Sequence, residues 1–289
     1  MPMATLPAKQ FALSVCRQAA ILMAGAALVL STQAVELTAT PAAVQAVIHA
    51  RLGRGQLDAI DATNDAGETT FDVSFTTQSG EDAGFTVAED GTVLSVEVAL
   101  AATPAAVQKT IRERATGWQL EDLSQDLTEM ETSYDVEVST NGRETSFTVA
   151  SDGALLSAEV TLAETPPAVQ TTIKSQVANG TCQSISEEFD PAGNSFDVDA
   201  RTTAGGRDSF TVGMDGTLQS VEVSLEKVPP AARKTIRNKM GDGKILQIEK
   251  SLVEKKDGVL PYEVEGRKDG RPFNFSVGPH GRFLGMDEN

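Results

Sequence analysis

The sequence has few of the residues on which enzyme chemistry usually depends. Its 289 residues include two histidines, two cysteines and one tryptophan. Histidine is the side chain that titrates nearest neutral pH and the commonest metal ligand, so its scarcity argues against most acid–base and metal-dependent mechanisms. Basic residues are also scarce, with 24 Lys and Arg against 41 Asp and Glu. We therefore expect no catalytic site, no cofactor and no nucleic-acid partner.

Long hydrophobic runs are absent, with one short exception near the start. Ala19 to Leu30 is apolar over 12 residues, follows Lys9 and Arg17, and precedes the small residues Thr32-Gln33-Ala34. A membrane-spanning helix needs about 20 apolar residues. The pattern instead predicts a secretory signal peptide over residues 1–34. We expect no membrane span, and a mature chain that is soluble in the periplasm or secreted.

What the sequence does contain is one motif repeated four times. The motif begins at Pro41, Pro104, Pro166 and Pro229, which are spaced by 63, 62 and 63 residues. A fixed period of this kind indicates duplicated structural units and leaves no stretch long enough for a separate catalytic domain. After the signal peptide we therefore define repeat 1 (35–100), repeat 2 (101–162), repeat 3 (163–225) and repeat 4 (226–289).

Each repeat is predicted to open with a short amphipathic helix. Apolar residues recur at helical spacing after the proline, as in Val44 with Ile48. A proline at the first helical position sacrifices no hydrogen bond, and a preceding threonine can cap the helix. The expected caps are Thr40, Thr103 and Thr165, and the glycines expected to end the helices are Gly53, Gly117, Gly180 and Gly241.

The remainder of each repeat alternates between apolar and polar residues, which is typical of half-buried strands. Asp-Gly pairs at 90–91, 152–153 and 215–216 predict two-residue type I′ hairpin turns, and His280-Gly281 takes their place in repeat 4. The sequence thus predicts an α+β fold of four tandem modules, each with one short helix packed on a roughly four-stranded antiparallel sheet. Units of about 60 residues are marginal alone, so neighbouring modules should pack together.

This order of motifs resembles the PepSY-like modules of the beta-lactamase-inhibitor-like type. The resemblance is carried by Pro104 to Ile111, Tyr134 to Val138, Phe147-Thr148-Val149 and Asp152-Gly153, and it recurs over nearly all of the mature chain. It implies an extracytoplasmic helix-on-sheet module that binds or inhibits secreted enzymes, without a cofactor or catalytic residues. The chain departs from the pattern in having four fused copies and in lacking the turn aspartate in repeat 4.

Comparison among the repeats removes the remaining candidates for chemistry. His49 occupies a helix position that is basic in the other three repeats, which predicts an exposed polar site. Cys182 aligns with Leu57, Leu120 and Ile245, so we expect a buried and unreactive thiol. Cys16 belongs to the predicted signal peptide, and no disulfide is expected. Trp118 lies just after the second predicted helix and is expected to be a packing residue rather than a platform for a ligand.

Acidic residues are the one polar feature that recurs. Alternation places them on the sheet face opposite the helix, where like charges on adjacent strands repel unless solvent, cations or a basic partner relieve them. This face is either a solvated surface or a binding surface. The candidate binding residues are Asp72, Glu97, Asp135, Glu137, Glu159, Asp197, Asp199, Glu222, Glu263 and Glu265.

Two functional hypotheses remain at this point. The first is an exported, non-catalytic binding protein that inhibits or modulates a secreted or envelope enzyme. The second is an acidic structural or cation-buffering protein of the cell surface that binds calcium weakly. Residues 64–67 lack the ligand spacing of an EF-hand and indicate a turn. Repeat 4 differs from the others in its basic character, with 13 basic and 9 acidic residues from Lys227 onward, through divergence or for head-to-tail association.

Overall fold

The computed structural model of the chain describes residues 33–65, 68–128, 132–254, 258–268 and 271–286. The predicted signal peptide therefore lies outside the described residues except for Gln33–Ala34. These two residues form β1, which pairs with β2 (Gln56–Asp65). Within the described part, no helix is long and apolar enough to cross a membrane.

Each repeat contributes one α-helix, and each α-helix follows a single turn of 3-10 helix. The 3-10 turns are η1 (Leu37–Ala39), η2 (Leu100–Ala102), η3 (Leu162–Glu164) and η4 (Leu225–Lys227). The α-helices are α1 (Ala42–Leu52), α2 (Ala105–Arg114), α3 (Pro167–Val177) and α4 (Pro230–Met240).

Strands follow each helix in the order in which the alternating segments occur. Repeat 1 forms β2, β3 (Glu68–Thr76), β4 (Asp82–Ala88) and β5 (Val93–Glu97). Repeat 2 forms β6 (Gln119–Asp126), β7 (Ser133–Thr140), β8 (Arg143–Ala150) and β9 (Leu155–Glu159). Repeat 3 forms β10 (Thr181–Glu188), β11 (Ser195–Arg201), β12 (Arg207–Gly213) and β13 (Leu218–Glu222). Repeat 4 forms β14 (Lys244–Ser251), β15 (Tyr262–Lys268), β16 (Arg271–Pro272), β17 (Phe275–Val277) and β18 (Phe283–Met286).

The prediction of four modules, each with its own sheet, is wrong, because the strands of the described residues, 18 in number, form one continuous antiparallel sheet. Three pairings cross the repeat boundaries: β5 with β6, β9 with β10, and β13 with β14. From repeat 2 onward, the helix at the start of each repeat connects the last strand of the preceding repeat to the first strand of its own repeat. These two strands then pair with each other. This pairing satisfies backbone groups that an isolated module would leave exposed at its edges.

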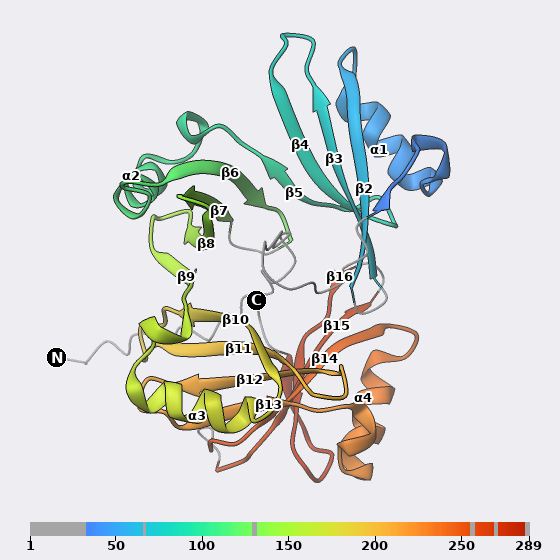
Figure 1. Cartoon of the computed structure of the whole chain (residues 1–289). Coiled ribbons are helices and arrows are strands. Elements are labelled where there is room, and N and C mark those ends of the chain that lie inside the picture. Colours follow the sequence, from blue (N-terminus) through green and yellow to red (C-terminus); the bar gives the residue numbers. More distant parts are fainter. Residues whose placement is uncertain (1–32, 66–67, 129–131, 255–257, 269–270, 287–289) are drawn as a thin grey trace, which may run out of the picture.

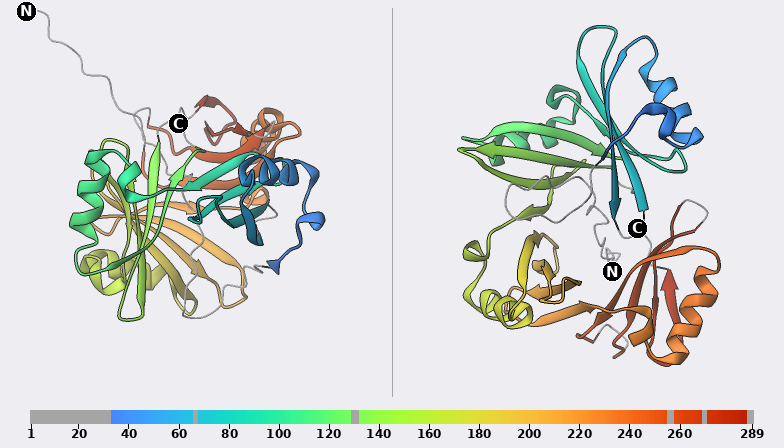
Figure 2. Two further views of the ribbon diagram at one scale, coloured as in Figure 1. Left: turned by 90° about the horizontal axis from the view of Figure 1, so that it is seen from above. Right: turned by 45° about the vertical axis from the view of Figure 1, so that its right-hand side comes forward.

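The sheet curls through the four repeats, and the helices lie on its outer side (Figures 1 and 2). Four hydrophobic cores fill the space between the helices and the sheet, one for each repeat. In repeat 3, for example, Val169 and Ile173 of α3 pack with Phe196, Val198 and other buried strand residues. The face opposite the helices therefore turns toward the inside of the curl, and we call it the inner face.

The predicted threonine caps are wrong, because proline occupies the N-cap position of all four helices. Each threonine instead binds backward, as where the Thr40 hydroxyl donates to the carbonyl of Leu37 at 2.8 Å. The glutamine four residues after the proline donates its side-chain amide to the threonine carbonyl, as Gln45 does to Thr40 at 2.8 Å. This repeated pair of bonds, rather than an N-cap bond from threonine, holds the 3-10 turn against the helix.

The helix ends differ among the repeats. Gly53 and Gly241 are C-caps as expected, whereas Ala115 and Ala178 cap α2 and α3 in place of Gly117 and Gly180. Ala178 has φ 48° and ψ −108°, close to the values of Gly53. A side chain is strained in this region of backbone space.

Replacing Ala178 by glycine should therefore raise the free energy of unfolding by about 1 kcal/mol. Urea denaturation measures the change. Ala115→Gly is the matched control, because Ala115 has φ −81° and its replacement by glycine should destabilise the protein by up to about 1 kcal/mol. A loss of stability in Ala178→Gly would contradict the inferred strain.

The Asp-Gly turns are not of type I′. Only the glycine has positive φ, for example 88° at Gly153, and the aspartate carboxylate accepts the backbone N–H two residues later. The glycine lies against the first turn of the helix, where a Cβ on Gly153 would come within 2.9 Å of Ala106 backbone atoms. Asn141 and Gly142, both with positive φ, form a type I′ pair between β7 and β8. The repeated Asp-Gly therefore marks close packing of the turn on the helix.

Candidate functional site

The inner face brings all ten predicted carboxylates onto one side of the sheet. Directly paired residues of antiparallel strands point to the same face, and the pairings place these side chains opposite the hydrophobic cores. Nine of them are half-buried, and Glu97 is exposed. The prediction described this face as wet, whereas the curl withdraws most of its carboxylates partly from water. Whether they bind a partner remains a prediction.

An aspartate–threonine hydrogen bond recurs on the inner face of repeats 1 to 3. Thr86 donates to Asp72 at 2.7 Å, Thr148 to Asp135 at 2.8 Å, and Thr211 to Asp197 at 2.7 Å. Each pair is directly opposed in the strand register. Burial raises the pKa of Asp72, although the Thr86 hydrogen bond partly counters this, and the nearby Asp61 raises it further.

Glu137 lies at the centre of an acidic cluster in repeat 2. It faces Asp122 directly across the β6–β7 pair. Burial raises the pKa of Glu137 to about 7, and repulsion from Asp122, Glu144, Asp135 and Glu159 adds to this increase. A carboxyl with this pKa is partly protonated at neutral pH.

A second cluster lies where repeat 3 meets repeat 4. Glu222 on β13, Glu249 on β14 and Glu263 on β15 form a row of three directly paired glutamates. Burial raises the pKa of Glu249 to about 7, and repulsion from Asp197, Glu265 and Glu263 acts in the same direction, although the Ser220 hydrogen bond partly counters this. Each of the two clusters thus holds one carboxyl that titrates near neutral pH.

Several carboxylates of this face were not predicted from the sequence, among them Asp61, Asp122, Asp126 and Glu249. These four belong to the first strand of a repeat, whereas the predicted residues come from later strands. Extending the apolar–polar alternation back through that strand would have placed them on the same face. Their importance depends on the cross-strand partner, which only the register shows.

The described residues bring no three His, Cys, Asp or Glu side chains into a group that could hold a metal ion. Weak calcium binding therefore remains a prediction without a site. Residues 66–67 of the predicted 64–67 turn lie outside the described residues.

The histidines and the cysteine offer no arrangement for catalysis. His49 on α1 and His280 in a turn are exposed, and their imidazole rings form no hydrogen bond or ion pair within the described part of the chain. Cys182 is half-buried rather than fully buried as expected, and it packs against the core of repeat 3. Burial raises the pKa of the Cys182 thiol, and Asp199 raises it further, which disfavours the reactive thiolate.

Trp118 packs against the core of repeat 2, where Phe189 of repeat 3 also packs. The other three repeats have glycine at this position, and at Gly180 a Cβ would lie 2.1 Å from the Arg201 carbonyl oxygen. Trp118 therefore has a structural role at the boundary of repeats 2 and 3.

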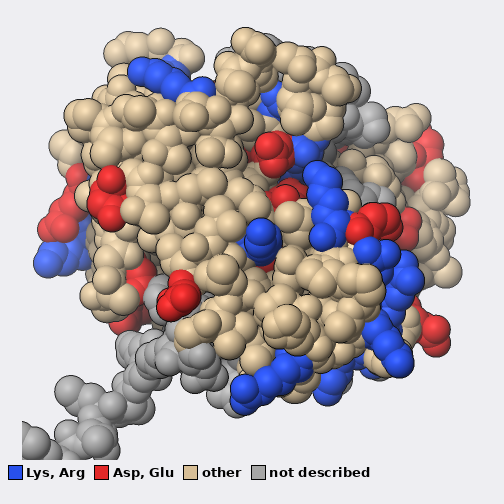
Figure 3. All heavy atoms as spheres, turned by 90° about the horizontal axis from the view of Figure 1, so that it is seen from below, with Lys and Arg blue, Asp and Glu red and all other residues tan. Residues whose placement is uncertain are grey.

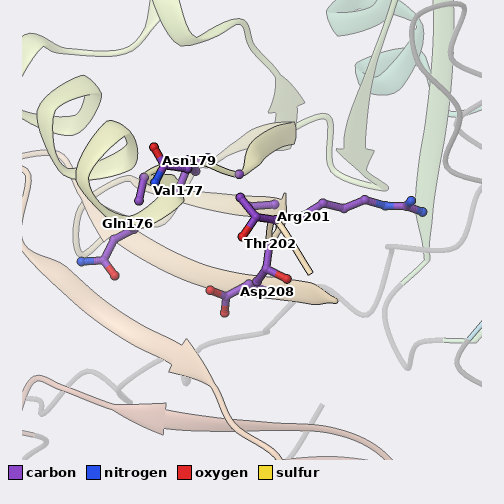
Figure 4. Close-up of a pocket in the computed structure, with 10 residues that line it drawn as sticks. Gln176, Val177, Asn179, Arg201, Thr202 and Asp208 are labelled. Atoms are coloured by element: carbon purple, nitrogen blue, oxygen red, sulfur yellow. The ribbon is translucent and has the colours of Figure 1, made fainter. Parts of the chain in front are cut away.

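Two further surface features involve residues other than the ten candidate carboxylates. A hollow of about 240 Å³ at the end of α3 is lined by residues that include Asn179, Thr202 and Asp208, and the Arg201 side chain points away from the Asp208 carboxylate (Figure 4). Lys and Arg side chains gather toward the side on which α4 lies (Figure 3). Lys234 and Arg237 of α4 are exposed.

No protein-family model and no curated protein matches the chain. Part of the chain aligns with each of several solved structures from Bacteroides. A DUF2874 family protein from Bacteroides ovatus is 18% identical, with 40% of this chain and 84% of that chain covered, at a TM-score of 0.32. A BLIP-like protein from Bacteroides fragilis is 14% identical, with 43% and 88% covered, at a TM-score of 0.31. A DUF2874 family protein from Bacteroides vulgatus, described as a candidate periplasmic protein, is 15% identical, with 45% and 97% covered, at a TM-score of 0.29. No family assignment, and no PepSY membership, follows from likenesses of this size.

Proposed function

We propose that the chain is a non-catalytic binding protein whose inner face takes up a cationic segment of another protein. The observation that carries the proposal is the concentration of half-buried carboxylates on this face, two of which have a pKa of about 7. Raised pKa values show that ionisation here is opposed by burial and by neighbouring charge. A Lys- or Arg-rich segment would relieve this repulsion. Part of the binding free energy would therefore come from removing an unfavourable interaction among carboxylates of the free protein.

The partner we propose is a secreted or envelope protein. More specifically, we propose that the partner is an enzyme, which the chain modulates or inhibits. The proposal rests on the leader-like residues 1–34, which predict export, and on the resemblance of the repeated motif to inhibitor-like modules. The acidic face also suits such a partner, because complementary charge accelerates encounter and selects against acidic proteins.

A fluorescent oligolysine peptide provides a direct test of this charge preference. We expect it to bind in low salt, with weaker binding as ionic strength rises, and we expect an oligoglutamate peptide of equal length not to bind. Isothermal titration calorimetry measures both. Equal affinity for the two peptides would contradict the proposal. Calcium binding in the absence of any oligolysine binding would favour the cation-buffering alternative.

Reversing one charge of the inner face locates the binding surface. Glu137→Lys should weaken oligolysine binding about tenfold or more, because it places a cation among Asp122, Asp135 and Glu159. The matched control is Glu113→Lys on the outer side of α2, where Glu113 is exposed and faces Lys109 at 3.9 Å. An equal loss in both variants would show that the peptide senses only net charge and would contradict an inner-face site.

A further inference from the structure

A chain of side-chain oxygens crosses the boundary between repeats 3 and 4 on the inner face. Thr211 Oγ1 lies 2.7 Å from Asp197 Oδ1, Ser220 Oγ lies 3.0 Å from Thr211 Oγ1, and Ser220 Oγ lies 2.9 Å from Glu249 Oε2. The chain thus runs from β11 through β12 and β13 to β14, with a carboxyl group at each end. All three distances are those of hydrogen bonds.

The three oxygen–oxygen contacts need three hydrogens. Each hydroxyl group has one hydrogen, and an ionised carboxylate has none. With both carboxylates ionised, Thr211 and Ser220 supply two hydrogens for three oxygen–oxygen contacts, so one contact has no hydrogen. One added proton completes the chain: Glu249 donates to Ser220, Ser220 donates to Thr211, and Thr211 donates to Asp197.

The surroundings of Glu249 favour the proton at that end of the chain. Gln247 Nε2 donates to the other carboxyl oxygen, Oε1, at 2.9 Å, which leaves Oε2 to bear the hydrogen. Burial raises the pKa of Glu249, as does repulsion from Asp197 on β11 and from Glu263 and Glu265 on β15, whereas the Ser220 hydrogen bond lowers it. Glu222 on β13 and Glu263 on β15 are the direct cross-strand partners of Glu249. The Glu249 pKa of about 7 is consistent with a proton held at neutral pH.

The other two repeat boundaries lack this arrangement. The position of Glu249 is occupied by Ser124 where β5 meets β6 and by Ser186 where β9 meets β10. Ser124 pairs with Glu97 and Asp135, and Ser186 pairs with Glu159 and Asp197. A serine thus separates the two flanking carboxylates at these boundaries, so no titrating group lies in the middle of the row.

We propose that Asp197, Thr211, Ser220 and Glu249 hold one proton in common near neutral pH, and that loss of this proton loosens the β13–β14 pairing between repeats 3 and 4. Loss of the proton removes one hydrogen bond and places a third negative charge between Glu222 and Glu263. The boundary of repeats 3 and 4 is then the pH-sensitive joint of the sheet, and the other two boundaries are not. This inference is independent of any partner of the inner face.

Amide hydrogen exchange tests the proposal on the full chain without a ligand. The backbone N–H groups that cross each boundary include a flanking pair: Val223 and Leu252 at the proposed joint, Val98 and Leu127 between repeats 1 and 2, and Val160 and Phe189 between repeats 2 and 3. We expect the protection factors of Val223 and Leu252, corrected for the intrinsic pH dependence of exchange, to fall about tenfold from about pH 6 to about pH 8. The protection factors of the other four should change far less.

Two variants identify the group responsible. Glu249→Gln can donate to Ser220 at every pH, and Glu249→Ser reproduces the residue found at the other boundaries. Either variant should abolish the pH-dependent fall at Val223 and Leu252. An equal fall at all three boundaries of the unmodified protein would overturn the proposal, as would a fall that persists in both variants. If a variant fails to fold, the comparison of the three boundaries in the unmodified protein still tests the proposal.

Discussion

Truncation of Phe196 to alanine is expected to lower the free energy of unfolding by about 3–5 kcal/mol. Phe196 is 2% exposed and packs with Val198 and with Ile173 of α3 in the core of repeat 3. Removal of its ring leaves a cavity that these neighbours can fill only in part. Met214→Ala is the control, because Met214 is 47% exposed and its loss should change stability by no more than about 0.5 kcal/mol.

The same variant tests whether the repeats share one sheet. Trp118 is the only tryptophan of the chain and lies in repeat 2, so its fluorescence reports on a different repeat from the mutated one. Because β9 pairs with β10 and Phe189 packs on the core of repeat 2, the urea midpoint reported by Trp118 should also fall. An unchanged Trp118 midpoint, with circular dichroism showing a separate early transition, would contradict the continuous sheet.

The protein is expected to lose stability as pH rises from about 5.5 to about 8. Glu249 and Glu137 each have a folded pKa of about 7, above the ordinary value of 4.5. The folded state therefore binds more protons than the unfolded state between these values, and unfolding becomes easier as pH rises through this window. Stability from these groups is fully present below about pH 4.5 and is lost by the time both are ionised.

For Glu249, which is mostly buried, this change amounts to about 2 kcal/mol between about pH 5.5 and about pH 8. Glu137 contributes less, because solvent screens a carboxyl that is more exposed. Urea denaturation at the two pH values gives the difference directly. Glu249→Gln should remove the part of the pH dependence of the unfolding free energy that Glu249 contributes.

Glu164→Gln is the matched control for this pH dependence. Hydrogen bonds from Thr161 and the nearby Arg143 lower the pKa of Glu164, so its effect on stability appears at a more acidic pH. The profile between about pH 5.5 and about pH 8 should therefore stay unchanged in this variant. A profile that is already flat in the unmodified protein would contradict the raised pKa values.

The local elements could be predicted from the sequence because each depends on neighbouring residues. Proline with apolar residues at helical spacing marks the helix of each repeat, and aromatic–polar alternation marks the strands. The division into four separate sheets failed because pairing between β5 and β6 joins residues on either side of a helix, and no local pattern encodes it. The threonine caps failed because a 3-10 turn precedes each helix and takes the hydroxyl as a donor.

The candidate site could be predicted in outline and not in detail. Alternation places Asp135 and Glu137 on the face opposite the core, and the structure has them there. Their burial arises from the curl of the whole sheet, which no single repeat specifies. Glu249 escaped prediction because its environment consists of Glu222 from another repeat and Glu263 from a later strand. The positions equivalent to Glu249 in repeats 2 and 3 are occupied by Ser124 and Ser186. Comparing the repeats at this position could have identified Glu249 from the sequence.

The central claim is that the curled sheet concentrates carboxyl groups on its inner face so that some retain a proton near neutral pH. Carbon NMR of the glutamate carboxyl groups, followed through a pH titration, tests it most directly. We predict midpoints of about 7 for Glu137 and Glu249, and a midpoint below 4.5 for Glu164, whose carboxyl accepts hydrogen bonds on the outer surface. Midpoints near 4.5 for all three groups would contradict the account.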